Sequence, residues 1–141
     1  MKWRASVDAA LAPVGLTHAQ YTVLASLRGI TRSGLTPSQR KLADHTGLDP
    51  IYISKLVRRL ESAGLIERAP DPDDSRAVTL SITEEGRRVV DRAIAIVHEL
   101  QEHLTAPLGG MDSRRIQALM KDLELLIGAP VTTDDTKGTQ A

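Results

Sequence analysis

The sequence of 141 residues contains no cysteine and no phenylalanine. The absence of cysteine excludes disulfides, thiolate metal sites and redox sensing by thiols. Aromatic residues make up only 2% of the chain, so the core must be built from Leu, Ile, Val and Ala. This composition favours helices over a β-sandwich or barrel, which depend more on aromatic and β-branched residues.

The chain also lacks a long apolar run. No segment approaches the roughly 20 apolar residues that a membrane span requires. No apolar stretch follows the basic N-terminal residues, as it would in a signal peptide. These absences predict a soluble cytoplasmic protein with no membrane partner.

The formal net charge is zero, with 18 basic and 18 acidic residues. Nucleic-acid-binding proteins usually carry a basic excess, so this balance is mildly unfavourable for such a partner. The distribution of charge along the chain makes this balance less unfavourable for DNA binding, because basic residues outnumber acidic ones over residues 1–35. Acidic residues outnumber basic ones over residues 84–127, which places most of the negative charge away from the N-terminal half.

Apolar periodicity and capping signals predict six helices. Thr17 and Gln20 have the spacing of a capping box at the start of the second helix. Thr36 repeats this signal at the start of the third helix, with Pro37 in the first helical position, where a missing N–H group is tolerated. The predicted helices span residues 3–12, 17–29, 36–47, 50–63, 84–105 and 112–127.

Beyond the fourth helix the periodicity changes to that of strands. Residues 65–68 and 78–82 are typical of two short strands, and the polar residues 70–77 between them are rich in turn formers. Thr83 is expected to cap the helix that follows. Residues 128–141 are polar, small and aperiodic, and we expect this tail to be disordered.

The third and fourth helices have the spacing of a helix-turn-helix. A small Ala43 lets the two helices approach, Gly47 can make the turn, and Ile53 and Leu56 can pack the second helix against the first. The spacing is only moderately specific, because many enzymes contain such helix pairs. It nevertheless indicates a DNA-binding unit in which residues 50–63 form the recognition helix.

This recognition helix is predicted to have one apolar and one polar face. Burial of Ile53, Leu56, Val57 and Leu60 would expose the opposite side. Arg and Lys bind guanine edges or phosphates, Ser binds either, and an aliphatic side chain can contact a thymine methyl group. An ordinary solvated helix face is the alternative interpretation. The residues expected to contact DNA from the helix pair are Ser38, Gln39, Ile51, Tyr52, Ser54, Lys55, Arg58 and Arg59.

The polar hairpin tip beside this helix is predicted to be a wing. A wing can reach the adjacent minor groove, where Arg is the favoured side chain, so we predict that Arg76 binds there. The acidic neighbours of Arg76 would repel phosphate. We hypothesise that Asp74 holds the Arg76 guanidinium in a fixed fork and so orients the wing. A polar β-turn without a role in binding is the alternative.

Six segments of the sequence match one known pattern: Gly15–Tyr21 with Leu24, Leu42–Asp44, Ser54–Glu61, Gly64–Arg68, Asp71–Ala77 and Thr83–Gly86. Together they resemble the MarR family of bacterial transcriptional regulators, over roughly residues 3–127. The resemblance implies an obligate homodimer, pseudo-palindromic sites in double-stranded DNA and, often, release by a small-molecule effector. By position it implies a wing-tip DNA contact for Arg76 and groove contacts for Ser54, Lys55 and Arg58.

We therefore expect a mainly α fold with a small β-wing. Residues 16–83 would form the winged helix-turn-helix DNA-binding lobe of a single chain spanning residues 1–127. Residues 1–15 and 84–127 would form a helical dimerisation region, because their apolar faces are wider than one small lobe can bury. The short segment before Gly15 and the scarcity of aromatic residues depart from the family pattern and bear mainly on effector binding.

The predicted function is that of a sequence-specific transcriptional repressor acting as a homodimer. A winged-helix module that binds protein and not DNA is the alternative, supported by the zero net charge and the acidic wing. We predict no enzyme activity and no cofactor, because the sequence has no nucleophile–base pair, phosphate-binding Gly-rich loop or paired carboxylates. His98, Glu102 and His103 have a spacing that a metal could use, but such residues more often lie on a solvated helix face, and we predict no metal site.

Overall fold

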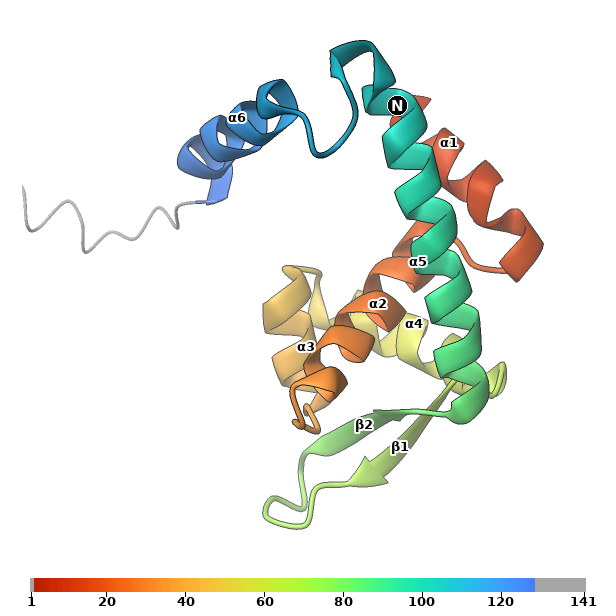
Figure 1. Cartoon of the computed structure of the whole chain (residues 1–141). Helices are drawn as coiled ribbons and strands as arrows, with labels where there is room; N and C mark the ends of the chain where they lie inside the picture. The colour runs from red at the N-terminus through yellow and green to blue at the C-terminus, as the bar shows by residue number, and fades with distance from the viewer. Residues whose placement is uncertain (1, 129–141) are drawn as a thin grey trace, which may run out of the picture. The chain divides into compact units, whose positions relative to one another are not determined.

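Helices make up most of residues 2–128, the part of the chain that the computed structural model describes (Figure 1). These residues fall into two compact units, divided between Leu100 and Gln101 within one long helix. The elements of the chain are α1 (Lys2–Leu11), η1 (Ala12–Val14), α2 (His18–Arg32), α3 (Gln39–Thr46), α4 (Pro50–Ser62), β1 (Ile66–Pro70), β2 (Val78–Ile82), α5 (Glu84–Thr105), η2 (Ala106–Leu108), α6 (Arg114–Leu123) and η3 (Glu124–Gly128).

Side-chain caps begin the helices of the first unit. The predicted capping box of α2 is confirmed, because Thr17 Oγ1 accepts the Gln20 N–H group at 3.2 Å and Gln20 Oε1 accepts the Thr17 N–H group at 3.0 Å. The Asp49 carboxylate accepts the N–H groups of Ile51 and Tyr52 at 2.9 and 3.1 Å and so caps α4. These bonds satisfy donors that the helix itself leaves unpaired.

The start of α3 differs from the sequence prediction. The helix begins at Gln39, and its N-cap is Ser38, whose Oγ accepts the Lys41 N–H group at 3.1 Å. The predicted cap at Thr36, with Pro37 inside the helix, is wrong. Pro37 is instead held in extended backbone, because its carbonyl oxygen accepts the Leu80 N–H group.

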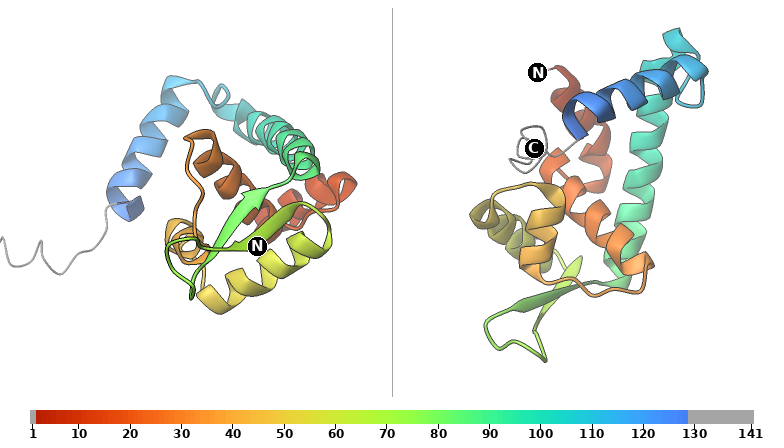
Figure 2. Two further views of the ribbon diagram at one scale, coloured as in Figure 1. Left: turned by 90° about the horizontal axis from the view of Figure 1, so that it is seen from below. Right: turned by 90° about the vertical axis from the view of Figure 1, so that its left-hand side faces the viewer.

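This bond attaches the segment before α3 to the hairpin. The Leu80 N–H group lies 2.9 Å from the Pro37 carbonyl oxygen, and Ser38 pairs with Thr79 as an isolated antiparallel bridge. The segment therefore acts as a short third strand beside β2. It brings the N-terminal end of α3 next to the hairpin, which projects beyond the helices of its unit (Figures 1 and 2).

The hairpin itself is an antiparallel pair in which Ile66 lies opposite Ile82 and Pro70 lies opposite Val78. Its first strand runs two residues further than the predicted 65–68. Thr83 joins the second strand to α5, because its Oγ1 accepts the Gly86 N–H group at 2.9 Å and donates to the Gly64 carbonyl oxygen at 2.7 Å. The predicted cap at this position is confirmed.

The core of the first unit is aliphatic, as the composition predicts. Its buried side chains are Val, Leu, Ile and Ala from α1 to α5 and both strands. The predicted inward face of α4 is confirmed, since Ile53, Leu56, Val57 and Leu60 are all buried, and so is Ala43 of α3. Burial of these side chains fixes which side of α4 remains exposed.

The second unit contains the end of α5, η2, α6 and η3. Gly109 and Gly110 adopt left-handed backbone (φ 96° and 88°), which interrupts the helical path between α5 and α6. Ser113 Oγ accepts the Ile116 N–H group at 3.2 Å and caps α6. The predicted helix 112–127 ends at Leu123 and continues as the π-helical turn η3.

Most of the predicted tail, residues 129–141, lies outside the described residues. Within residues 2–128, no helix combines the length and the apolar character that a membrane crossing demands.

Gly86 is packed too closely to accept a side chain. A Cβ atom at this position would overlap the Leu65 carbonyl oxygen and lie 2.8 Å from Ile82 Cγ1. We expect Gly86→Ala to lower the free energy of unfolding by about 1–3 kcal/mol, as overpacking does, despite the higher helix propensity of Ala. Denaturant or thermal unfolding measures the change.

Gly29 provides the matched control, because it also lies within a helix, yet a Cβ atom added there would meet no neighbouring atom within 4 Å. Gly29→Ala should stabilise the protein by up to about 1 kcal/mol. Equal stability of the Gly86→Ala variant and the parent would contradict the close approach of α5 to the hairpin.

Candidate nucleic-acid interface

The exposed side of α4 carries the side chains that the sequence analysis selected. Ile51, at the second position of the helix, is 70% exposed, and Tyr52 is also exposed. Lys55, Arg58 and Arg59 are exposed as well, while Ser54 is half-buried. The Asp49 cap and Pro50 hold the first turn, so the helix end that presents Ile51 has a defined backbone.

Several of these cations have no carboxylate partner. Among the described residues, Lys55 and Arg59 of α4 form no ion pair, nor do Arg40 of α3 and Arg76 of the hairpin. The ion pairs in this part of the chain are instead Arg28–Asp91, Glu61–Arg68 and Glu85–Arg88. Positive charge therefore remains available on α3, α4 and the hairpin despite the neutral balance of the whole chain.

Glu61 connects the end of α4 to β1. Arg68 Nε donates to Glu61 Oε2 at 3.1 Å, and this hydrogen bond is the main reason that the pKa of Glu61 is lowered. The charge of Arg58 contributes a smaller part of that shift. The contact joins the first strand of the hairpin to the C-terminal end of α4.

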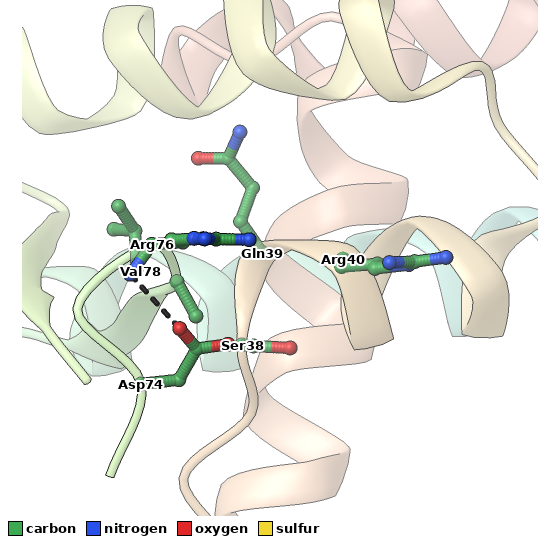
Figure 3. Close-up of a pocket in the computed structure, with 7 residues that line it drawn as sticks. Ser38, Gln39, Arg40, Asp74, Arg76 and Val78 are labelled. Atoms are coloured by element: carbon green, nitrogen blue, oxygen red, sulfur yellow. Dashed lines mark hydrogen bonds between the residues drawn. The ribbon is translucent and has the colours of Figure 1, made fainter. Parts of the chain in front are cut away.

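In the turn of the hairpin, Asp74 has a different partner from the one hypothesised. Its carboxylate oxygen accepts the backbone N–H group of Arg76 at 2.9 Å (Figure 3), and no ion pair forms with the Arg76 guanidinium. The predicted guanidinium fork is therefore wrong. A short Asp side chain reaches the amide two residues ahead more readily than a distant guanidinium, which gives the turn seen for Asx residues.

Backbone bonds close the rest of the turn. The Asp71 N–H group donates to the Ala77 carbonyl oxygen, and the Ala77 N–H group donates to the Asp74 carbonyl oxygen, both at 3.0 Å. The Asp71 carboxylate accepts the Asp73 N–H group at 2.8 Å. Two of the acidic side chains thus stabilise the backbone of the turn, which accounts for their presence beside Arg76.

A cavity of about 430 Å³ lies between the first turn of α3 and the hairpin (Figure 3). It brings together four predicted residues, Ser38, Gln39, Asp74 and Arg76, and adds Arg40, which was not predicted. In Figure 3 the Arg76 guanidinium is directed toward the start of α3, while that of Arg40 is directed away from it. The only signal for Arg40 in the sequence was its position directly after Gln39.

A second cavity, of about 300 Å³, is lined by other residues that were predicted to contact DNA. It lies between α1, the start of α2 and α4, and it includes Tyr52, Lys55 and Arg59. Its other polar residues were not predicted as site residues, because they come from α1 and the start of α2. The lining residues are Arg4, Asp8, Thr17, His18, Ala19, Tyr52, Lys55, Leu56 and Arg59.

The predicted residues are thus not gathered in one pocket. Ile51, Ser54 and Arg58 of α4 line neither cavity. A surface with separated cationic groups suits an extended ligand better than a compact one.

Residues 2–128 contain no cluster of three or more His, Cys, Asp or Glu side chains that could hold a metal ion. Glu102, considered above as a metal ligand, accepts the Met111 N–H group through its carboxylate at 3.3 Å.

A helix pair joined by a tight turn and followed by a two-stranded hairpin defines a winged helix-turn-helix protein. The model of the MarR family matches residues 16–78. An uncharacterized HTH-type transcriptional regulator of Bacillus subtilis, YdcH, is 39% identical over 100 residues, which cover 71% of this chain and 68% of YdcH. The HTH-type transcriptional repressor Rv2887 of Mycobacterium tuberculosis is 31% identical over 121 residues, covering 85% and 84%.

Solved structures agree with this assignment. A mutant MarR of E. coli complexed with operator DNA is 26% identical, with a TM-score of 0.72, and the match covers 86% of this chain and 85% of that one. CouR of Rhodococcus jostii, bound to p-coumaroyl-CoA, is 30% identical with a TM-score of 0.73, covering 92% and 86%. The chain belongs to the MarR family of transcriptional regulators.

The role of Asp74 can be tested without DNA. We expect Asp74→Ala to speed hydrogen exchange of the Arg76 amide several-fold, because that N–H group loses its acceptor. Asp74→Asn should preserve protection, since the side-chain amide oxygen still accepts the bond. Nuclear magnetic resonance of the free protein measures the exchange rate of the Arg76 amide in both variants.

Asp73→Ala serves as the control, because the Asp73 side chain accepts no hydrogen bond among the described residues. Equal exchange of the Arg76 amide in all three variants would show that Asp74 does not order the turn.

Proposed function

We propose that this MarR-family regulator represses transcription by binding pseudo-palindromic sites in double-stranded DNA as a homodimer. The observation that carries the proposal is the set of unpaired cations on α3, α4 and the hairpin of a chain with no net charge. Cations that protein carboxylates leave free can neutralise phosphates and release counterions. The repressor name of Rv2887 supports the direction of regulation.

In this proposal α4 enters the major groove with its N-terminal end near the bases. Recognition helices of winged and related folds contact base edges mainly through their first residues. Ile51, Tyr52 and Ser54 would then lie nearest the bases. Lys55, Arg58 and Arg59 would contact base edges or phosphates further along the helix.

The hairpin would reach the adjacent minor groove through Arg76, because the negative potential of that groove attracts guanidinium groups. Asp74 would orient this wing by holding the turn backbone and not the Arg76 side chain. Ser38, across the cavity from the hairpin, would contact the phosphate backbone between the two grooves, and Gln39 would lie at the edge of the major groove.

The homodimer is proposed from the apolar surface of the second unit. Leu125, Leu126 and Ile127 are each more than three-quarters exposed in the single chain, and Leu119, Met120 and Leu123 of α6 are exposed as well. Exposed apolar side chains in this number on one short segment favour a protein partner. A two-fold pairing would set the recognition helices about 34 Å apart, one turn of DNA.

A small-molecule effector is proposed for the 300 Å³ cavity, because CouR binds a ligand and because this cavity shares side chains with the proposed DNA-binding face. The cations Arg4, Lys55 and Arg59 outnumber the one carboxylate of the lining, Asp8, and so favour an anionic ligand. Such a ligand would compete with DNA for Tyr52, Lys55 and Arg59 and thereby release the regulator.

DNA binding is tested with a random-sequence duplex and a duplex selected from a random pool, over a series of salt concentrations. We expect selective binding that weakens steeply with salt, as counterion release requires. Arg76→Ala should lower affinity for every sequence. Arg58→Ala should change selectivity through loss of a base contact, or lower the salt slope by about 1 through loss of a phosphate contact.

Arg92→Ala, which replaces an exposed and unpaired arginine of α5, is the control and should leave affinity unchanged. Absence of salt-dependent duplex binding would contradict the proposal and favour a winged-helix module that binds protein.

Dimerisation is tested by sedimentation of Leu126→Asp beside Lys121→Asp. Leu126 is 78% exposed in the single chain, so its replacement should not unfold the unit. An unpaired carboxylate in a buried interface costs several kcal/mol, and we expect dimerisation to weaken by at least about tenfold. Lys121→Asp should remain dimeric, and a monomeric parent protein would contradict the proposal.

A further inference from the structure

Ile51 is unusual among the exposed residues of α4 because it is aliphatic. The rest of this face presents Tyr52, Lys55, Arg58 and Arg59, all with polar or charged ends. Ile51 is 70% exposed, so packing within its own protein buries little of its apolar surface. The Asp49 carboxylate accepts its N–H group at 2.9 Å, so the backbone that carries this side chain is held in the first turn of the helix.

A notch in the protein surface lies directly beside this helix end. It is a cavity of about 410 Å³ lined by Gln39, Arg40, Ala43 and Pro50, where α3 meets the start of α4. Ala43 and Pro50, the residue before Ile51, supply apolar walls, and Arg40 is the only charged residue in the lining. The notch is therefore suited to an apolar group flanked by polar ones.

Gln39 lines both this notch and the cavity beside the hairpin. Its Oε1 atom is shielded from solvent and has no hydrogen-bond partner among the described residues. An unpaired buried acceptor is unfavourable. Rotation of the side chain can offer this oxygen to a ligand in the notch without breaking any hydrogen bond of the free protein.

We infer that the Ile51 side chain and the Gln39 amide together read an A·T pair or step in each half-site. Ile51 contacts the C5 methyl group of thymine, and Gln39 bonds to the major-groove edge of adenine. The inference rests on the proposed binding of duplex DNA and specifies the bases that the site selects.

The chemistry of the major groove supports this choice of bases. The thymine methyl group is the one apolar group that base edges present there, and an aliphatic side chain offers no hydrogen bond to any other group. Adenine presents a donor at N6 and an acceptor at N7, which match the oxygen and nitrogen of a Gln amide. Guanine presents two acceptors and cytosine a donor, and neither matches both ends of the amide.

The test for Ile51 replaces each thymine of a selected duplex by deoxyuridine, one at a time, which removes only the methyl group. For the parent protein we expect one position in each half-site where affinity falls about fourfold, the factor that burial of one methyl group gives. Ile51→Ala should abolish the effect at that position. Ile51→Val, which keeps a branched apolar side chain, should retain most of it.

The test for Gln39 replaces each adenine by 7-deaza-2′-deoxyadenosine, which removes the N7 acceptor. We expect one sensitive adenine, in the same base pair as the sensitive thymine or the next, and loss of that sensitivity in Gln39→Ala. Unchanged melting temperatures of the variants exclude misfolding as the cause.

Three results would overturn the inference or one of its contacts. Salt-dependent binding with no deoxyuridine penalty, or with a penalty that persists in Ile51→Ala, removes the thymine contact and leaves the proposed DNA binding intact. Sensitivity to 7-deazaadenine that persists in Gln39→Ala removes the adenine contact. Absence of any duplex binding defeats the proposed function itself, and the inference with it.

Discussion

The hydrogen bond from the Leu80 N–H group to the Pro37 carbonyl oxygen is the contact on which the geometry of the proposed interface most depends. It holds the segment before α3 in extended backbone, and it thereby sets Ser38 as the cap and Gln39 as the first residue of the helix. Both residues consequently line the cavity beside the hairpin. The same hydrogen bond thus determines both where α3 begins and where the hairpin lies relative to it.

Much of the fold could be predicted from local patterns. The inward face of α4, the capping box at Thr17 and the Thr83 cap of α5 each depend on residues within a few positions of one another. Helical periodicity and capping chemistry determine such features without knowledge of the remaining chain. The exposed side of α4, and so the selection of Ile51 and Lys55, followed directly from the buried side.

Other features depend on contacts that local patterns do not contain. The start of α3 was misplaced because Leu80, which binds Pro37, lies in a distant strand. Arg40 and Arg4 were missed because their cavities join elements far apart in sequence. The role of Asp74 was misjudged for the opposite reason, since its nearest partner was the adjoining backbone and not the side chain of Arg76. The sequence therefore predicted which helices and strands form the site better than it predicted which groups each side chain contacts.

The attachment of the hairpin at two places has a mechanical consequence. Its second strand is bonded to the start of α3 through Pro37, and its first strand is joined to the end of α4 through Arg68 and Glu61. Bending the hairpin alone would break both attachments, whereas turning the whole lobe as a rigid body breaks neither. In the proposed homodimer, a signal that releases DNA would therefore break the fewest contacts by changing the spacing or tilt of two intact lobes, and not by folding back the hairpin.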